Sequence, residues 1–320
     1  MKNKRKKIVS PQKRFKTKLG LALGGGGARG AAHLGVLRAF ADKNIEISCI
    51  AGTSVGAFVA ALYAFGKSPS QIETVFENLS FLKISSLFPV KLGLSRNQGV
   101  HDLLEKELGN ARIEEAQIPL AIVCTDLITG HAKVFTRGPL AKIVQASASF
   151  PGIYSPIEYH DMILVDGAIS ENIPVSGVKT LGANFIVGVS LSDYKQHNQK
   201  PKGLLDVIGR CFDIIVDQNS IHQMKMSDYM INLDVSFMSR FKLTEKERAI
   251  TLGYSQTQSL LSRSLWYWWF KPHMDYFYGV IKSLKELFSA LFSHPKYKVL
   301  FGAVPGEENL WGKIKKWFSK

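Results

Sequence analysis

The sequence is short of cysteine and of long apolar runs, and each shortage limits what kind of protein it can be. Its 320 residues include three cysteines, Cys49, Cys124 and Cys211, with no CxxC pair. Such scattered positions speak against a disulfide framework or a cysteine zinc site, so we expect reduced, buried thiols. No run reaches the roughly 18 uncharged apolar residues that span a bilayer, so no transmembrane helix is expected.

Acidic residues are missing from the start of the chain. Residues 1–18 carry nine Lys or Arg and no Asp or Glu, and residues 261–320 carry ten basic against four acidic residues. The segment between them holds 22 of each sign, so the net charge of +15 comes from the two ends. This distribution predicts attachment to an anionic surface rather than an active site for acidic substrates.

The basic residues 1–18 have the composition of a disordered arm. The apolar run that follows, Leu19–Leu23, is too short for the hydrophobic part of a signal peptide, and Arg29 interrupts what comes after it. Together with the reduced cysteines, this predicts a cytoplasmic protein.

From Leu19 onward, short β-rich runs alternate with helical segments. Strands are expected over 19–23, 45–51, 118–124, 162–165, 184–190 and 228–235. Helices are expected over 30–42, 55–65, 70–79, 101–108, 140–147, 174–181, 204–225 and 243–262. This alternation predicts an α/β three-layer sandwich with a mostly parallel central sheet, whose active site lies at the carboxyl ends of the strands.

The composition changes after residue 262, because all five tryptophans lie beyond it. Phe277–Phe292 has apolar residues at three-four spacing, and "LWGKIKKWFSK" sets Trp, Ile and Phe against Lys. Three parts are therefore predicted: a basic arm (1–18), a catalytic domain (19–262) and an amphipathic helical extension (263–320). The two basic ends are expected to hold the protein peripherally on the inner membrane face, although the extension could instead cap the core.

The segment "AGTSVGA" contains a GxSxG motif formed by Gly52, Ser54 and Gly56. It lies between a predicted strand and a predicted helix, the context in which such a serine is held exposed on a sharp turn. The N-terminus of the helix would point its dipole and free N–H groups at the Ser54 oxygen. The alternative is a glycine-rich packing turn.

The segment "LGGGGARG" has a GxGxxG pattern at Gly25, Gly27 and Gly30, which is also found in dinucleotide-binding folds. Those folds need an acidic residue at the end of the second strand, and here "CIAGTS" fills that place. No GK[ST] follows, so a nucleoside-triphosphate loop fails as well. Bare N–H groups beside a nucleophilic serine instead favour an oxyanion hole.

A carboxylate also lies at a strand end. In "MILVDGAISENIPV", Asp166 follows a predicted strand and precedes Gly167, so it can reach a site at the same edge of the sheet. Asp-Gly is equally typical of a simple turn.

In this order, the three pieces resemble the patatin-like phospholipase family. The resemblance covers about residues 19–260 and includes "GGGGARG", "GTSVG", "IPLAIVCTDLITG", "QASASFPGIYSPI", the "DGA" at 166–168 and the "NIPV" after it. Bacterial, cytosolic-type members look most similar. The family implies hydrolysis of acyl esters of phospholipids and lysophospholipids, with no metal and no cofactor.

The resemblance also implies a serine–aspartate dyad without histidine. Ser54 would be the nucleophile and Asp166 the general base. The remaining family positions are the oxyanion loop, with Arg29 shaping it, and the motif residues: Gly25, Gly26, Gly27, Arg29, Gly30, Gly52, Gly56, Gly167 and Ala168. Because an ordinary Asp pKa is badly matched to a serine hydroxyl, we expect a dry site that raises the pKa of Asp166.

Other interpretations stay open. His197 and His222 follow Asp166 as the histidine of a Ser–Asp–His triad would, but neither has motif context, and His33 is expected to pack. Residues 81–100 could form a wall of an acyl pocket. A membrane-bound scaffold without hydrolysis is the alternative function, acyl transfer to an alcohol would use the same residues, and nucleic-acid binding is not expected because the basic arm lacks interleaved aromatics.

Overall fold

The computed structural model describes residues 17–79, 97–191, 200 and 203–262. The chain divides into two compact units, residues 1–260 and 261–320. Most of the basic arm, the extension 263–320, His197 and most of the segment 81–100 lie outside the described residues. None of the helices within the described ranges is both long and apolar enough to cross a membrane.

In the described part of the chain, eight strands form one sheet in the order β5-β6-β3-β2-β1-β7-β8, with β4 paired to β3. The strands are β1 (Leu19–Leu23), β2 (Cys49–Thr53), β3 (Leu120–Asp126), β4 (Ala132–Phe135), β5 (Ile157–Tyr159), β6 (Met162–Asp166), β7 (Phe185–Ser190) and β8 (Tyr229–Asn232). The five strands β3, β2, β1, β7 and β8 are parallel, and β4, β5 and β6 add antiparallel pairs on the β3 side.

The helices connect these strands and cover the sheet. They are α1 (Ala31–Asp42), α2 (Val55–Ala64), α3 (Pro69–Glu77), α4 (Gln98–Leu108), α5 (Leu140–Ser147), α6 (Val175–Thr180) and α7 (Leu204–Lys225), and residues 246–262 are also helical. Three short 3₁₀ turns complete the list: η1 (Gly27–Gly30), η2 (Ile113–Glu115) and η3 (Gly167–Ile169).

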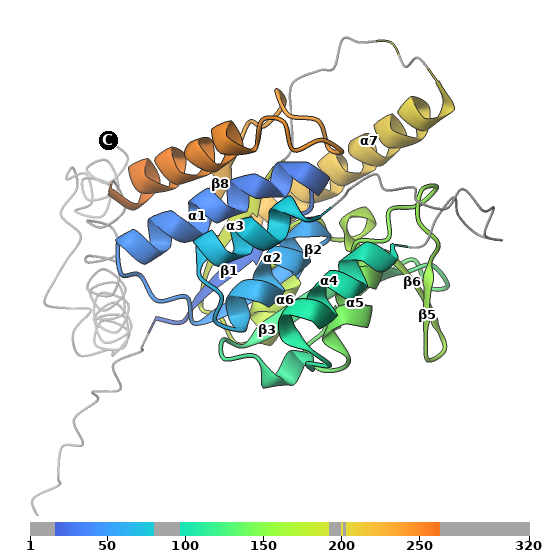
Figure 1. Cartoon of the computed structure of the whole chain (residues 1–320), viewed down its shortest axis with the longest axis horizontal. Helices are drawn as coiled ribbons and strands as arrows, with labels where there is room; N and C mark the ends of the chain where they lie inside the picture. Colours follow the sequence, from blue (N-terminus) through green and yellow to red (C-terminus); the bar gives the residue numbers. More distant parts are fainter. Residues whose placement is uncertain (1–16, 80–96, 192–199, 201–202, 263–320) are drawn as a thin grey trace, which may run out of the picture. The chain divides into compact units, whose positions relative to one another are not determined.

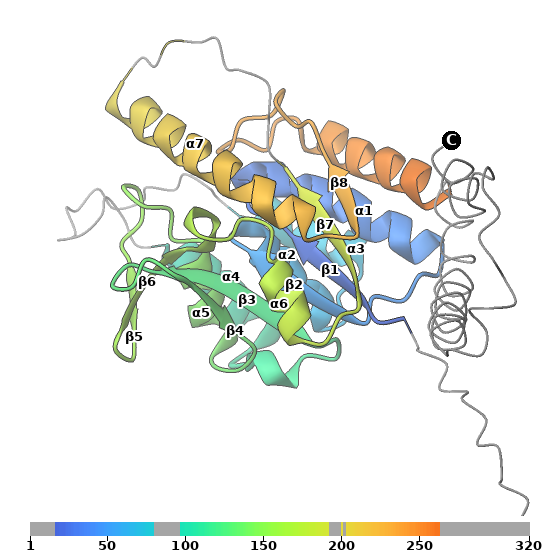
Figure 2. The same cartoon turned by 180° about the vertical axis from the view of Figure 1, so that it is seen from behind.

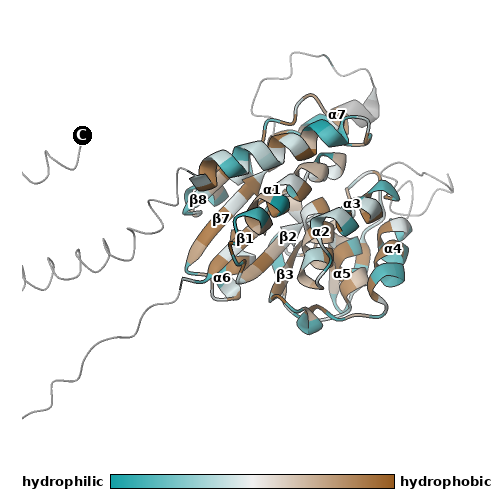
Figure 3. Cartoon of the chain, turned by 60° about the vertical axis from the view of Figure 1, so that its left-hand side comes forward, coloured by the Kyte–Doolittle hydropathy of each residue, from teal (hydrophilic) through white to brown (hydrophobic). Residues whose placement is uncertain are grey.

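The predicted three-layer α/β architecture is confirmed. Helices α1 to α5 lie on one face of the sheet, whereas α6 and α7 lie on the other (Figures 1 and 2). The central strands between them are apolar (Figure 3), and every residue of β1, β2, β3 and β7 is buried. Since both faces are covered, these strands are continuous apolar runs rather than alternating ones.

The sheet fixes where a site can form. β1 pairs with β2 on one side and with β7 on the other, so chain order reverses next to β1. In open α/β sheets such a switch point opens a crevice at the carboxyl ends of the strands. The glycine loop follows β1, and Ser54 follows β2, so both lie at this edge.

Some expectations about local structure were wrong. The second strand covers Cys49–Thr53 instead of 45–51, so it runs directly into Ser54. β4 and β5 were not predicted, because strands of four and three residues with only partly buried side chains carry little apolar pattern. Cys49 and Cys124 are buried in β2 and β3 as expected, but Cys211 is exposed on α7.

The helical segment 246–262 packs closely on α1 through two glycines. A Cβ at Gly35 would lie 2.0 Å from the carbonyl oxygen of Ile250, and a Cβ at Gly253 would lie 2.1 Å from that of Ala32. Both contacts are with backbone atoms, which cannot move aside without shifting a helix. The two helices therefore approach each other at a distance that only glycine allows.

This packing predicts opposite effects for two Gly→Ala changes. Gly35→Ala should lower the free energy of unfolding by about 2–4 kcal/mol, in the range for overpacked or distorted cores, because the new methyl group meets the Ile250 carbonyl. Gly99→Ala on α4, where no heavy atom lies within 4 Å, should raise it by about 0.5–1 kcal/mol from helix propensity. Urea unfolding followed by circular dichroism measures both. Equal effects at the two positions would contradict this close approach.

Candidate active site

Ser54 occupies a strained turn between β2 and α2. Its backbone has φ 54° and ψ −124°, a conformation that a non-glycine residue rarely adopts. The turn is tight on both sides of the serine: a Cβ at Gly56 would lie 2.1 Å from the carbonyl oxygen of Leu23, and one at Gly52 would lie 2.3 Å from that of Gly56. The spacing of the GxSxG motif therefore has a steric cause in this structure.

The turn is held by a hydrogen-bonded serine. The backbone N–H of Ser54 donates to Oγ of Ser147 at 2.9 Å, and that hydroxyl donates to the carbonyl of Val123 at 2.6 Å. Ser147 is fully buried at the end of α5. It thus connects the nucleophile turn to β3 and offsets the cost of the strained backbone.

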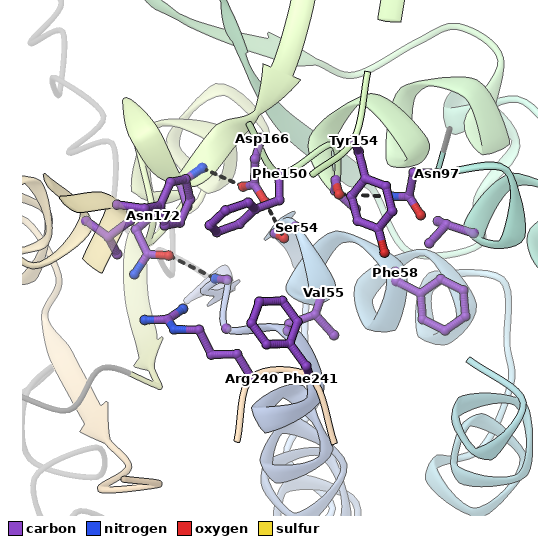
Figure 4. Close-up of a pocket in the computed structure, with 18 of the residues that line it drawn as sticks. Ser54, Val55, Phe58, Asn97, Phe150, Tyr154, Asp166, Asn172, Arg240 and Phe241 are labelled. Carbon is purple, nitrogen blue, oxygen red and sulfur yellow. Dashed lines mark hydrogen bonds between the residues drawn. The ribbon is translucent and has the colours of Figure 1, made fainter. Parts of the chain in front are cut away.

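The side chain of Ser54 points at Asp166. Its hydroxyl donates to Oδ2 of the carboxylate at 2.7 Å, although the two residues are 112 positions apart in sequence (Figure 4). Both are buried. The structure thus brings together the two residues that the motifs placed at the same edge of the sheet.

Asp166 is the last residue of β6, and its backbone is fixed on both sides. Its N–H donates to the carbonyl of Ser149 at 3.0 Å, and its own carbonyl accepts from the Thr125 hydroxyl at 2.9 Å. The carboxylate oxygen that does not meet Ser54 accepts the N–H of Ala168 at 2.9 Å. Gly167 and Ala168 form η3, so the "DGA" motif aims one oxygen at the serine and holds the other.

The environment of Asp166 raises its pKa from the ordinary value near 3.8 to about 6. Loss of hydration on burial is the main cause, and the hydrogen bonds from Ala168 and Ser54 and the positive charge of Arg240 offset only part of it. The shift is in the direction expected from the sequence. A carboxylate with this pKa is a better match to the serine hydroxyl than an exposed aspartate.

The glycine loop is anchored at three points. His33 Nε2 contacts the carbonyl oxygen of Gly24 at 2.8 Å, and the N–H of Gly25 donates to Oδ1 of Asn172 at 3.1 Å (Figure 4). The N–H of Ala28 donates to the backbone carbonyl of Arg240 at 2.7 Å. Gly25 was predicted to serve the oxyanion hole, but in this structure its N–H is used in the hydrogen bond that holds the loop.

Gly26 and Gly27 are left with open N–H groups. Within the described residues no hydrogen bond uses the N–H of Gly26, and Gly27 begins η1, where an N–H has no partner inside the helix. Both residues line the same pocket as Ser54. The loop lies next to the serine, since a Cβ at Gly25 would be 3.2 Å from Cβ of Ser54. The loop can thus offer two backbone donors to an oxygen that gains negative charge.

Arg29 lies away from the reacting atoms. Its side chain is buried, and Nε donates to the carbonyl of Met238 at 2.9 Å rather than lining the pocket. Arg29 therefore supports the loop from outside the pocket, through its hydrogen bond to Met238. Gly30 follows it and meets the side chain of Val55, where a Cβ would lie 2.4 Å from a methyl carbon.

A largely apolar pocket opens from Ser54. Its apolar lining comes from α2, α4, α7, η3 and several loops: Val55, Phe58, Leu79, Val100, Ala148, Phe150, Tyr154, Ala168, Phe212, Val216 and Phe241. Its remaining lining consists of glycines and polar residues: Gly25, Gly26, Gly27, Ser54, Asn97, Asp166, Asn172 and Arg240. The arrangement suits a substrate with a polar reacting group and a long apolar tail.

Sequence reasoning missed two residues of this pocket. Asn172 holds Gly25 through Oδ1 and donates from Nδ2 to the Ser220 hydroxyl at 3.1 Å, and "NIPV" was noted without a role for its asparagine. Arg240 lines the pocket and pairs with Asp213 at 2.5 Å, and no motif surrounds it. Of the segment 81–100, residues Asn97 and Val100 do reach the pocket wall.

No histidine of the described chain lines the pocket. His33 is fully buried, and loss of hydration lowers its pKa to about 4, so it is neutral at pH 7 and serves the loop. His222 is exposed in the last turn of α7. The described residues also contain no group of His, Cys, Asp and Glu side chains that could hold a metal ion.

Fold and site thus define a class of protein with an open α/β sheet and a serine–carboxylate pair at the carboxyl edge of its parallel strands. Residues 21–179 match the sequence model described as patatin-like phospholipase. The chain belongs to the patatin-like phospholipase family.

Curated relatives share the same region. An uncharacterized NTE family protein of Mycobacterium bovis is 34% identical over 178 residues, covering 55% of this chain and 49% of the relative. Lysophospholipase NTE1 of Candida glabrata is 34% identical over 187 residues, covering 54% of this chain and 10% of that protein. The chain thus spans about half the length of the mycobacterial relative and a small part of the yeast one.

Among solved structures, VipD from Legionella pneumophila superimposes with a TM-score of 0.54 at 14% identity, over 78% of this chain and 67% of that one. At this identity the match shows the fold alone. It agrees with the open, mostly parallel sheet described above.

The raised pKa of Asp166 predicts a pH-dependent effect of Asp166→Asn on stability. Because the folded pKa of about 6 lies above the ordinary value, the ionised carboxylate destabilises the fold above pH 6, and this penalty is absent below about pH 4. Asp166→Asn should therefore raise the free energy of unfolding by roughly 1–3 kcal/mol at pH 7.5 and by much less at pH 4. Urea unfolding at both pH values measures this, and a gain that does not change with pH would contradict it.

Proposed function

We propose that the protein is a serine lipid acyl hydrolase that uses Ser54 and Asp166. The hydrogen bond of 2.7 Å between the Ser54 hydroxyl and Oδ2 of Asp166, at the polar end of an apolar pocket, is the observation that carries this proposal. The family match supports it, because the family is described as patatin-like phospholipase.

In the proposed reaction, the Ser54 oxygen attacks the ester carbonyl while Asp166 accepts its proton. The carbonyl oxygen becomes anionic, and the N–H groups of Gly26 and Gly27 stabilise it. Donors of this kind are typically worth about 3–4 kcal/mol each. The proton passes from Asp166 to the leaving alcohol, and Asp166 then activates the water that releases the acid from Ser54.

The substrate class follows from the pocket. Aromatic and aliphatic side chains on α2, α4 and α7 can surround an acyl chain, and the polar groups of Asp166, Asn172 and the glycine loop lie at the serine end. A single-chain lysophospholipid or a phospholipid presented at a membrane surface is the proposed substrate. The name lysophospholipase of the Candida glabrata relative supports this choice.

Removal of the nucleophile tests the proposal. Ser54→Ala should lower the hydrolysis of p-nitrophenyl butyrate and of lysophosphatidylcholine by about 10³-fold or more, as in other enzymes that lose an activated serine. Release of p-nitrophenol and of fatty acid measures the two rates. Ser70→Ala is the matched control, because Ser70 is exposed on α3 outside the pocket and its loss should leave both rates unchanged.

A fluorophosphonate probe separates an enzyme from a scaffold, since only an activated serine reacts with it. Peptide mass spectrometry should find the label on Ser54 in the wild-type chain and nowhere in Ser54→Ala. An unlabelled wild-type chain that also hydrolyses neither ester would overturn the proposed function and favour a scaffold.

The pH profile tests the base. Asp166 must be ionised to accept the serine proton, so kcat/KM for p-nitrophenyl butyrate should rise with pH through a single ionisation near pH 6, where the pKa of Asp166 lies. His33 does not contribute, because its pKa of about 4 leaves it neutral through that range. A stopped-time assay from about pH 3 to 8 measures the profile. An inflection near pH 4, or none, would show that Asp166 is not the base.

A further inference from the structure

Helix α7 carries a stripe of exposed apolar side chains. Four of its branched residues, Val207, Ile214, Ile215 and Ile221, are between 45% and 48% exposed. Cys211 is exposed on the same helix, as is Gln218. At about 100° per residue these six positions fall on one side of the helix. We call them the outer stripe.

The opposite side of α7 faces the pocket. Phe212, Val216, Ser220 and Gln223 are all buried, and their spacing places them diametrically opposite the outer stripe. Phe212 and Val216 line the pocket that opens from Ser54. One helix thus separates the acyl pocket from an exposed apolar surface.

The outer stripe bears no acid. Among α7 residues with described side chains, those that are exposed are Val207, Cys211, Ile214, Ile215, Gln218, Ile221, His222 and Lys225. Asp213 and Asp217 lie on one flank and are only partly exposed, and Asp213 is ion-paired with Arg240. The charge that the stripe presents is therefore zero or positive.

A second exposed apolar site lies at the same edge of the sheet. Leu127 and Ile128 are 51% and 63% exposed in the turn that follows β3, at the carboxyl end of that strand. The turn 127–131 also contains no acid. All six large apolar residues found exposed in the described chain lie on α7 or in this turn. The N-terminal end of α7 extends past the edge of the sheet (Figures 1 and 2).

We propose that the outer stripe of α7 binds the surface of a lipid bilayer and so places the pocket at the source of its substrate. This inference rests on the proposed function. An acyl chain has the shortest path out of a bilayer when the protein binds the bilayer close to its pocket, and α7 both lines the pocket and carries the exposed stripe on its other side. The six residues of the stripe carry no acid that would repel anionic headgroups.

A second copy of this chain is the other occupant that an apolar stripe could take. The stripe is interrupted by Gln218, and the same helix lines a pocket for an apolar molecule on its other side, so the observations favour lipid. The two cases differ in a measurable way, because a dimer would cover the stripe without vesicles.

Cys211 allows a direct test, because Cys49 and Cys124 are buried and a thiol reagent reaches Cys211 first. The full chain labelled there with an NBD fluorophore should show a blue-shifted, at least twofold brighter emission on vesicles of equimolar phosphatidylcholine and phosphatidylglycerol. Lipids with a nitroxide on the acyl chain should quench it. Flotation of the labelled protein with unchanged emission would show that other segments bind the membrane, and would overturn the proposal.

Paired variants test the function of the stripe. Ile214→Gln with Ile221→Gln should weaken vesicle partitioning by about tenfold, because two half-exposed isoleucines no longer enter the interface, while glutamine keeps the helix propensity. Hydrolysis of lipid in vesicles should fall with it. Gln218→Leu, which completes the stripe, should strengthen both. Hydrolysis of p-nitrophenyl butyrate should stay unchanged in all variants, since this ester is dissolved in water.

The outcomes separate the two proposals. If the wild-type chain hydrolyses neither p-nitrophenyl butyrate nor lipid, the proposed function is wrong whatever the vesicle-binding data show. If the double variant loses the soluble reaction equally, the stripe supports the fold and the lipid proposal is wrong. If the wild-type chain is a dimer in sedimentation, the double variant a monomer, and vesicle binding unchanged, the stripe is an interface between copies and the proposal also falls.

Discussion

The close backbone contact between the end of β1 and the first turn of α2 determines the arrangement of the rest of this site. The carbonyl of Leu23, at the end of β1, touches the first turn of α2 at Gly56 so closely that a Cβ there would lie 2.1 Å away. This contact sets the glycine loop beside the nucleophile turn. It also explains why α2 can begin directly after Ser54, with the serine forced into a strained conformation. The strain persists because neighbours on β3 and α5 hold the turn, through the Ser147 hydroxyl between them.

The burial that raises the pKa of Asp166 also lowers the stability of the folded protein when this carboxylate is ionised. A buried carboxylate loses its hydration, and here only two hydrogen bonds and the distant charge of Arg240 compensate. Arg240 is itself paired with Asp213, and the negative charge of Asp213 weakens the attraction between Arg240 and Asp166. A Ser–Asp–His triad places a histidine between acid and serine. Here the acid touches the serine directly, and a pKa near 6 is what lets a carboxylate take that role near neutral pH.

The sequence was most informative where steric necessity acts locally. Gly52, Ser54 and Gly56 lie within five residues, and the small residues that the turn requires are visible there, so their pattern predicted the turn and its place in the fold, although not the distant Ser147 that holds it. Asp166 was expected at the same edge as the end of a parallel strand, but β6 runs antiparallel to β3, and Asp166 reaches the site because it pairs with Cys124 near the carboxyl end of β3. Asn172 and Arg240 could not be predicted in this way, because each meets the glycine loop across more than 140 residues of chain. The N–H of Gly25 was assigned to the oxyanion hole because its hydrogen-bond partner, Asn172, lies 147 residues away and cannot be recognised from the sequence near Gly25.

The glycine loop therefore depends on elements that come late in the chain. Arg29 reaches the carbonyl of Met238, and the carbonyl of Arg240 receives the N–H of Ala28. Because Arg240 also pairs with Asp213 on α7, the loop that offers Gly26 and Gly27 to the substrate is connected to the helix that separates pocket from exposed apolar stripe. A shift of α7 at a lipid surface would be felt at Arg240 and, through its backbone, at the donors of the oxyanion hole. In the proposed function, substrate access and stabilisation of the transition state would then respond to the same surface.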